Sequence, residues 1–573
     1  MLAALCVALF VVTGATGAPQ QTSMQVVKPD AQAPPRDAAR EKGTASIKGK
    51  VVAAETGKPM RRVQISLSSP DFSESRSMST TALGVFEFKD LPAGRYTLSA
   101  SRSGFLRLQY GQRRPGEPGR PLQIGDGERV ANADFVLPRS GSISGHISDE
   151  LGDPLAGVNI YPAQWRYFRG KRRMVPISGG GPGGGGFNQT DDTGYFRISG
   201  LEPGDYFVLA TIRTTWTVDD KPNERIGFLP TYSGGTANPA DAMRIKVAMG
   251  QEASAGDFAM VPGRVASISG VATYSSGQPM AGESVNMVQE FAGPNWSSQF
   301  GMAGSKVNPD GSFLIKDVAP GEYRLSVRGP GDKDRPPEGV TVTINLAGED
   351  LAGVLLVGGS GGSLSGRVVS DTGVALPLAD SGRMRVSVRA IDPTTTYQTS
   401  FDQDNGRVKD DWTFDVTNVF GPNRISVGPL PTGWVVRSID FQGKDLADVP
   451  IDVRGGQRLD GITVVVSKTL PKMGGTILDD KGQPAEGTVL MFPEEPAKWG
   501  ENSRLIRTAR PDLSGRFEFR SVIPGTYLVV PLEYVRDGDW TDPEFLENLK
   551  EGAKRVQVDE TGAAGIALTL KKS

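Results

Sequence analysis

Cysteine and histidine are almost missing from this chain of 573 residues, in which each occurs once. Cys6 lies in an apolar N-terminal stretch, so the rest of the chain has no disulfide, thiol nucleophile or thiolate metal ligand. A zinc peptidase site needs at least two imidazoles with a carboxylate, and a serine-type triad needs a well-placed histidine. We expect His146 to be an ordinary strand residue. We therefore expect no enzyme, no catalytic residue, no metal site and no cofactor.

Net charge and long hydrophobic runs are also lacking. The formal charge is −2, so no global field draws the protein to nucleic acid or to an anionic membrane. The apolar run from Leu2 to Val12 is too short to span a bilayer, and small residues follow it up to Ala18. We interpret residues 1–18 as a signal peptide, with a buried or anchoring helix as the alternative. The mature protein is then expected to be secreted, periplasmic or part of the cell envelope, without a membrane span.

Glycine and proline are abundant, at 73 and 41 residues, and they gather between short stretches of alternating polarity. In the first of these stretches, Ile47, Gly49 and Val51 alternate with polar residues. A period of two with turn residues between the runs is typical of half-buried antiparallel strands. Residues 19–43 are rich in Pro, Gln, Ala and charge, with little to bury, and are expected to form a disordered linker.

A motif of three parts recurs along the chain. Each copy opens with a strand that contains a lead glycine, continues with D-x-x-G-x-F or a close variant, and ends with P-G-x-Y or P-A-G-x-Y. The lead glycines are Gly49, Gly145, Gly270, Gly366 and Gly475. They lie roughly 100 residues apart, which is the size of a small domain. The closing tyrosines are Tyr96, Tyr206, Tyr323 and Tyr527, whereas the degenerate fourth copy has Asn423 in the sequence Gly-Pro-Asn-Arg.

Each part of the motif has a structural explanation. An aspartate followed by a glycine that is free to take positive φ favours a tight turn, and Pro-Gly favours another. We expect each closing tyrosine to pack its ring in a core and to hydrogen-bond its hydroxyl near the sheet edge. One helix is predicted to begin at Asp542-Pro543 and to stop at Gly552, with Phe545, Leu546 and Leu549 as its apolar stripe.

The order of these motifs resembles the carboxypeptidase regulatory-like domain, an accessory transthyretin-like sandwich related to collagen-adhesin B-type stalk domains and to starch-binding-like folds. The resemblance implies an all-β protein of five tandem antiparallel β-sandwich (prealbumin-like) domains. Since the linkers are short, we expect them to form an elongated array. The expected boundaries are 44–138, 139–263, 264–358, 359–468 (divergent) and 469–573. No peptidase domain accompanies them.

Two sets of residues are candidate ligand sites. The stretch 165–173 is basic and aromatic, and a glycine-rich run follows it. This pattern indicates a flexible loop that binds an acidic polymer or phosphate or, alternatively, a solvated loop with aromatic anchors. Tryptophans near turns offer sugar-stacking platforms or, equally, plugs for the ends of a sandwich. The candidates for ligand contact are Trp165, Tyr167, Arg169, Arg172 and Trp296. The acidic stretch 402–406 has the wrong spacing for an EF-hand calcium loop.

These observations favour a non-enzymatic scaffold or binding rod whose partner is an unknown protein or glycan. The alternative is a carbohydrate-binding protein that recognises envelope or extracellular glycans through loop aromatics. An enzyme that uses carboxylates alone is a more distant third. Fold-level resemblance does not choose among these functions.

Overall fold

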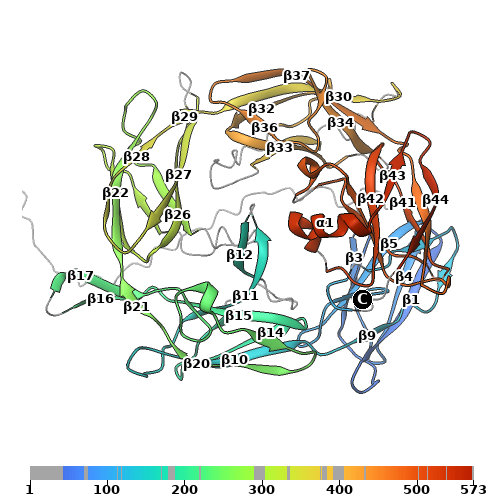
Figure 1. The fold of residues 1–573 in the computed structure, drawn as a ribbon, viewed down its shortest axis with the longest axis horizontal. Helices are drawn as coiled ribbons and strands as arrows, with labels where there is room; N and C mark the ends of the chain where they lie inside the picture. Colours follow the sequence, from blue (N-terminus) through green and yellow to red (C-terminus); the bar gives the residue numbers. More distant parts are fainter. Residues whose placement is uncertain are drawn as a thin grey trace, which may run out of the picture. The chain divides into compact units, whose positions relative to one another are not determined.

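The computed structural model describes residues 43–570, apart from 70–74, 113, 118, 169–170, 178–187, 219–220, 290–302, 332–335, 374–375, 377–383, 391–404, 431–433, 501–502, 513 and 537. As expected, the protein is all-β, with 57% strand and 4% helix (Figure 1). Within the described ranges no helix is both long and apolar enough to cross a membrane.

Buried hydrophobic side chains form five large clusters, and each draws on one stretch of the chain. The stretches are 45–137, 143–260, 266–356, 364–466 and 473–570. Each cluster falls inside one of the expected sandwiches, here numbered one to five in chain order. The boundaries between the sandwiches stay a prediction.

The first sheet of each sandwich is built in the same way around a lead strand. One neighbour of the lead strand is antiparallel and follows the D-x-x-G-x-F turn, and the other is parallel and comes last in the sandwich. The lead sheets therefore depart from the expected antiparallel pattern by two parallel pairs in the first sandwich and by one in each of the others. Their strands are β4 (Val85–Leu91), β1 (Ala45–Ala53), β8 (Arg129–Val130) and β9 (Phe135–Leu137); β14 (Tyr195–Leu201), β10 (Gly141–Ser148) and β20 (Glu252–Ala259); β25 (Ser312–Val318), β22 (Ala266–Thr273) and β28 (Leu351–Val357); β32 (Thr413–Val419), β30 (Gly362–Ser370), β37 (Arg458–Ser467), β34 (Val435–Phe441) and β35 (Lys444–Asp445); β41 (Arg516–Phe519), β38 (Met473–Leu478) and β44 (Ala563–Thr569).

The second sheet of each sandwich is antiparallel and holds the strand that carries the closing tyrosine or its replacement. Its strands are β3 (Ser75–Ser79), β2 (Gln64–Ser68), β5 (Gly94–Ser101), β6 (Leu108–Gln109) and β7 (Leu122–Ile124); β12 (Lys171–Pro176), β11 (Asn159–Phe168), β13 (Asn188–Gln189), β15 (Gly204–Thr211), β18 (Thr231–Tyr232) and β19 (Ile245–Val247); β24 (Ala303–Lys306), β23 (Ser284–Gln289), β26 (Gly321–Gly329), β27 (Glu338–Leu346) and β29 (Gly359–Ser360); β31 (Arg385–Ala390), β33 (Gly421–Gly428) and β36 (Ile451–Val453); β40 (Arg507–Ala509), β39 (Thr488–Pro493), β42 (Gly525–Leu532) and β43 (Lys554–Val558).

A few elements lie outside these paired sheets. A ribbon of three strands combines β16 and β17, which are inserted between β15 and β18, with β21, which follows β20. The short helices are all in the second and fifth sandwiches as far as the described residues go. They are β16 (Thr215–Val218), β17 (Lys221–Phe228) and β21 (Pro262–Arg264); η1 (Pro239–Asp241), η3 (Pro496–Lys498), η4 (Asp539–Thr541), α1 (Pro543–Leu549) and η5 (Lys550–Gly552).

The lead glycines are required by close backbone contact. In sandwiches two to five the pairing of the lead strand with its parallel neighbour shifts by one residue at this point, as at a β-bulge. The bulge turns a carbonyl oxygen of the parallel strand toward the glycine. A Cβ at Gly270 would collide with the Val354 oxygen, and one at Gly475 with the Ile566 oxygen. In the first four sandwiches the ring of the turn-motif phenylalanine also lies where a Cβ at the lead glycine would be.

The closing tyrosines pack as predicted. All four are buried, and each hydroxyl donates a hydrogen bond to the carbonyl oxygen four residues earlier, at 2.8–2.9 Å. The bond pins the Pro-Gly turn to the core, so the ring and the turn hold each other in place.

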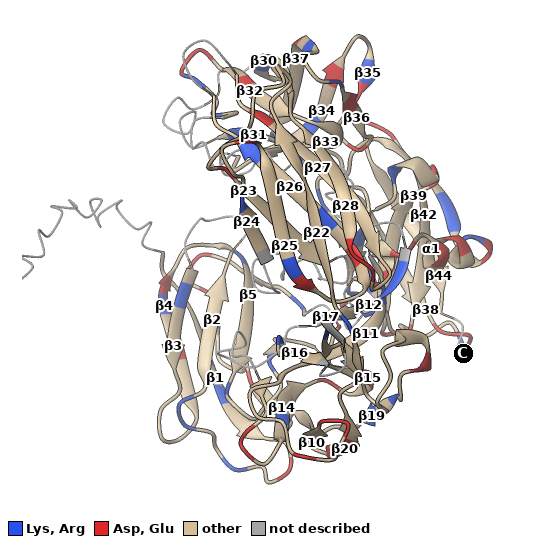
Figure 2. Ribbon diagram, turned by 90° about the vertical axis from the view of Figure 1, so that its left-hand side faces the viewer, with Lys and Arg blue, Asp and Glu red and all other residues tan. Residues whose placement is uncertain are grey.

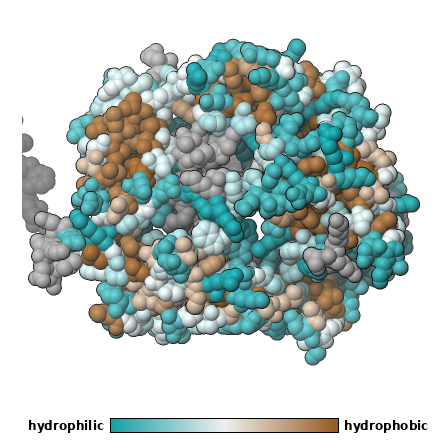
Figure 3. Space-filling view, viewed as in Figure 1, coloured by the Kyte–Doolittle hydropathy of each residue, from teal (hydrophilic) through white to brown (hydrophobic). Residues whose placement is uncertain are grey.

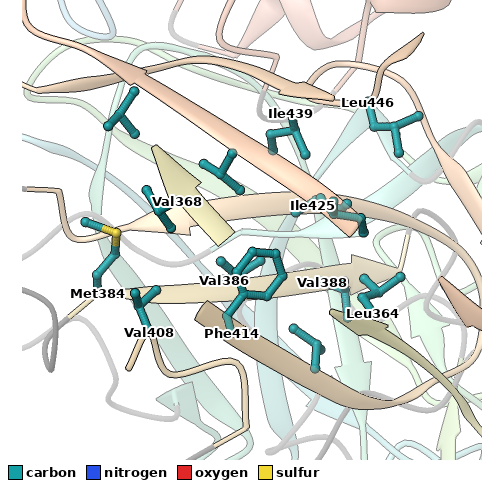
Figure 4. Close-up of a cluster of buried hydrophobic side chains, with 14 of the residues drawn as sticks. Leu364, Val368, Met384, Val386, Val388, Val408, Phe414, Ile425, Ile439 and Leu446 are labelled. Atoms are coloured by element: carbon teal, nitrogen blue, oxygen red, sulfur yellow. The ribbon is translucent and has the colours of Figure 1, made fainter. Parts of the chain in front are cut away.

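In the fourth sandwich, a smaller side chain makes the hydrogen bonds that hold this turn. Asn423 is buried, and its amide donates to the carbonyl oxygens of Phe420 and Gly421 at 2.9 and 2.6 Å. Its core surrounds the ring of Phe414 mainly with aliphatic side chains and also holds Trp434; Val386, Ile425 and neighbouring side chains are drawn in Figure 4. The degenerate motif therefore keeps the turn-to-core bond while losing the aromatic ring.

The turn and helix predictions are also confirmed. Each turn aspartate accepts hydrogen bonds from the backbone N–H and the hydroxyl two residues later, which lowers the pKa of its carboxyl; these are Asp191, Asp310, Asp411 and Asp512. Helix α1 begins at Pro543, and the Asp542 carboxylate caps it by accepting from the N–H of Glu544 at 2.9 Å. Leu546 is fully buried against the outer face of the second sheet of sandwich five.

We predict that Gly270→Ala destabilises the third sandwich by about 1–3 kcal/mol, because the added methyl group must push apart two hydrogen-bonded strands. Gly359→Ala is the matched control, since a Cβ there meets no atom within 4 Å. Urea-dependent hydrogen exchange of peptides from β22 and β28 measures the loss. Equal effects of the two substitutions would contradict the explanation.

We also predict that the two functions of a closing tyrosine can be separated in Tyr323. Tyr323→Phe removes only the hydroxyl and costs about 1 kcal/mol. Tyr323→Ala also empties part of the core and costs about 3–5 kcal/mol, as large aromatic truncations do. Calorimetry of the transition that belongs to the third sandwich distinguishes them, and a Phe variant as damaged as the Ala variant would refute this division.

Candidate ligand-binding hairpin

The basic and aromatic stretch 165–173 forms part of a β-hairpin rather than the expected loop. The first half of β11, from Asn159 to Ala163, pairs with β15 within the second sheet of sandwich two. The second half pairs with β12 alone, in a register that joins Ala163 to Pro176 and Phe168 to Lys171. Alternating aromatic and long side chains favour such extended pairing. The hairpin thus carries its side chains beyond the strand that anchors it.

The predicted ligand residues are only partly brought together. Trp165 lies opposite Met174 and is 38% exposed, whereas Tyr167 lies opposite Arg172 and is half-buried. The side chain of Arg172 is exposed. Arg169, Trp296 and the acidic residues at 402–404 fall outside the described residues. Trp165, Tyr167 and Arg172 therefore form the described part of the candidate site.

Other side chains of the hairpin are used inside the protein. Gln164 is buried, and its oxygen accepts from Arg166 at 3.0 Å and from Arg536 of the fifth sandwich at 3.3 Å. The Arg536 guanidinium also reaches the Glu202 carboxylate at 3.3 Å. On β12, Arg173 pairs with Glu322 of the third sandwich at 3.3 Å. Part of the basic character that suggested a polyanion site thus serves contacts between sandwiches.

The first and fifth sandwiches are also in contact, through the chain segment that follows β6. Glu117 and Arg510 form an ion pair of 2.7 Å in which both side chains are almost fully buried, at 5% and 7% exposure. Arg120 donates to the Pro511 carbonyl at 2.8 Å, and the Tyr534 hydroxyl donates to the Pro115 carbonyl at 3.1 Å. Short linkers alone do not reveal such pairing, because it depends on buried polar side chains distant in sequence.

Most of the other tryptophans that could stack a sugar are plugs. Trp216 packs its ring on Phe228 with centroids 5.0 Å apart and contacts the core of sandwich two. Trp499 is buried and donates its indole N–H to the Pro493 carbonyl at 2.7 Å. Trp540 packs in the same cluster beneath α1. These three confirm the plug interpretation.

His146 lies on the outer face of sandwich two. Its Nδ1 is 3.1 Å from the exposed Asp257 carboxylate, and its ring leans on Tyr195. In the described part of the chain no three His, Cys, Asp or Glu side chains gather in a way that could hold a metal ion.

Comparison with known families supports the resemblance read from the motifs. Residues 46–137 match the family model of the carboxypeptidase regulatory-like domain. The first sandwich is similar to that domain. The other four share its motif order and the pairing of its lead strand, which fits a tandem arrangement of similar sandwiches. No protein of curated function matches the sequence significantly.

Solved structures give weak similarities. The minor pilin GBS52 of Streptococcus agalactiae is 15% identical, with 38% of this chain and 96% of that chain covered and a TM-score of 0.20. The shaft pilin SpaA of Lactobacillus rhamnosus GG is 10% identical, with 38% and 98% covered and a TM-score of 0.19. The Bacillus anthracis TIE protein is 10% identical, with 83% and 71% covered and a TM-score of 0.14. TM-scores this low support no conclusion about architecture or function.

We predict that Arg510→Met weakens the contact between the first and fifth sandwiches, because the almost fully buried Glu117 carboxylate loses its ion pair with Arg510. Breaking one side of a buried pair costs about 3–5 kcal/mol. Arg555→Met is the control, since Arg555 pairs with Glu494 at the surface and such pairs contribute up to about 1 kcal/mol. Hydrogen exchange in residues 106–124 should rise in the first variant only. No difference between the variants would contradict the contact.

Proposed function

We propose that this chain is a non-enzymatic scaffold or binding protein made of five carboxypeptidase regulatory-like sandwiches, with the boundaries 44–138, 139–263, 264–358, 359–468 and 469–573. This proposal is based on the structural roles of the recurring motif residues. The glycines leave space for a backbone carbonyl group, the aspartates stabilise turns, and the tyrosines hydrogen-bond turns to the cores. Residues of this kind build a stiff support and leave recognition to insertions such as the β11–β12 hairpin.

The leader supports a location outside the cytoplasm. Residues 1–18 read as a signal peptide, so we place the mature protein in the periplasm, the cell envelope or the medium. The one cysteine, Cys6, lies in that leader, so the mature chain would form no disulfide outside the cytoplasm. The partner we propose is a protein or a glycan rather than a nucleic acid.

Glycan binding at the hairpin is the second candidate, and one observation favours it. Trp165 is a large aromatic side chain of the hairpin that is 38% exposed, and Arg172 is exposed on the paired strand. An exposed indole beside a guanidinium suits a sugar that carries acidic groups.

A binding screen with matched variants tests both candidates. The mature protein is applied to a glycan array and used to capture envelope proteins, beside Trp165→Ala, Arg172→Ala and the control Tyr195→Ala on the outer face of the same sandwich. If the hairpin binds glycan, the first two variants should lose about 1–3 kcal/mol of binding, by analogy with other aromatic stacking platforms. Binding unchanged in both variants would remove the hairpin site. Turnover of a peptide or glycan by the pure protein would overturn the non-enzymatic proposal itself.

A further inference from the structure

The outer faces of the five lead sheets differ in one sandwich. Just after the lead glycine, the outward residue is Lys50, His146, Arg367 or Thr476 in four sandwiches and Val271 in the third. A second position lies on the antiparallel neighbour, where one residue pairs with the residue just before the lead glycine. This residue is Glu87, Arg197, Asp415 or Glu518 in the same four sandwiches and Leu314 in the third. At both positions a residue that is polar in every other copy is aliphatic in this one.

The aliphatic positions lie together. Val271, Leu314, Leu355 and Val357 are 39%, 44%, 62% and 46% exposed, and all belong to β22, β25 and β28. Val271 pairs directly with Leu355, and Leu314 is opposite Ser269 on the central strand. Strands β22 and β28 contain no charged residue and are drawn tan in Figure 2, and Figure 3 shows hydrophobic surface over the same region. We call these four residues the aliphatic face.

We propose that the aliphatic face binds a second copy of this chain, sheet against sheet. The face of three strands measures roughly 26 by 14 Å, or about 370 Å², from ordinary strand spacings. That is within the range of about 300–600 Å² for the largest exposed apolar patches, and below the ~800 Å² per partner of a stable interface. The area fits a weak dimer that forms only at high concentration.

Charges at one end of the face are complementary to those of a second copy. Lys316 on β25 lies where the pairing with the lead strand shifts between Ala266 and Ile268, and Asp350 on the other side of the lead strand accepts from the Ser267 N–H at 2.7 Å. Both are exposed. A two-fold axis along β22 places β25 of one copy over β28 of the other. Lys316 of each copy then faces Asp350 of its partner, so two ion pairs form by symmetry.

The shapes of the two edges also match under this symmetry. Leu314 projects from the β25 edge, while the β28 edge at the same level is formed by the bulge at Gly353, where a Cβ would meet no atom within 4 Å. The leucine of one copy thus enters the hollow at the glycine of the other. The face lacks the aromatic side chains that stack sugars and the basic cluster that binds anionic lipid, so an aliphatic protein surface is the occupant that fits.

Sedimentation velocity of the full chain from about 1 µM to 1 mM tests the proposal, because this range covers weak association. Val271→Lys with Leu314→Glu recreates residues found at the same positions in sandwich one, so folding should survive. Leu83→Glu with Leu151→Lys makes the same changes at exposed leucines in other sandwiches. We expect a concentration-dependent dimer for the parent and the control, and a dissociation constant at least about tenfold higher for the first variant.

A charge exchange checks the geometry independently of the apolar contacts. Lys316→Glu should weaken the dimer, and adding Asp350→Lys should restore it. A parent chain that stays monomeric up to ~1 mM would overturn the proposal and leave the face to another protein. A dimer that survives Val271→Lys with Leu314→Glu would overturn it equally. Failure of the exchange to restore binding would refute the two-fold arrangement along β22.

Discussion

The close approach of one carbonyl group to one glycine governs the architecture of this protein. Where the last strand of a sandwich joins the lead strand in parallel, a bulge turns a carbonyl oxygen into space that any side chain at the lead position would fill. The turn-motif phenylalanine then lies against the same glycine in the first four sandwiches. Strand pairing, core packing and the turn motif thus all depend on the lead glycine. In the second sheet, the closing tyrosine or asparagine has the corresponding role, because its hydrogen bond holds a turn against the core.

Features set by local chemistry could be read from the sequence. Turn aspartates, closing tyrosines and the capped helix at Asp542 each depend on neighbours within a few residues, so their spacing is sufficient to predict them. The parallel pair in each lead sheet could not be read in this way. It joins the first and last strands of a sandwich, and alternation of polar and apolar residues does not encode strand direction.

The sequence predicted the candidate site less accurately than the fold. Composition pointed to the stretch 165–173, yet Arg173 of this stretch pairs with Glu322 of another sandwich. Contacts of this kind depend on residues hundreds of positions away, such as the buried pair of Glu117 and Arg510. The aliphatic face, in contrast, can be detected in the sequence. Comparing Val271 and Leu314 with their equivalents in the other copies shows the loss of polarity, once the strands are aligned on the lead glycines.

The central claim is that each sandwich is closed by its own core. Hydrogen exchange of the unmodified chain in increasing denaturant, followed by mass spectrometry for peptides from β1, β10, β22, β30 and β38, tests it most directly. The account predicts that protection in these five lead strands disappears at separate denaturant concentrations, each shared by the two sheets of one sandwich. Loss of protection in all five at one concentration would contradict it, because the sandwiches would then unfold as a single cooperative unit.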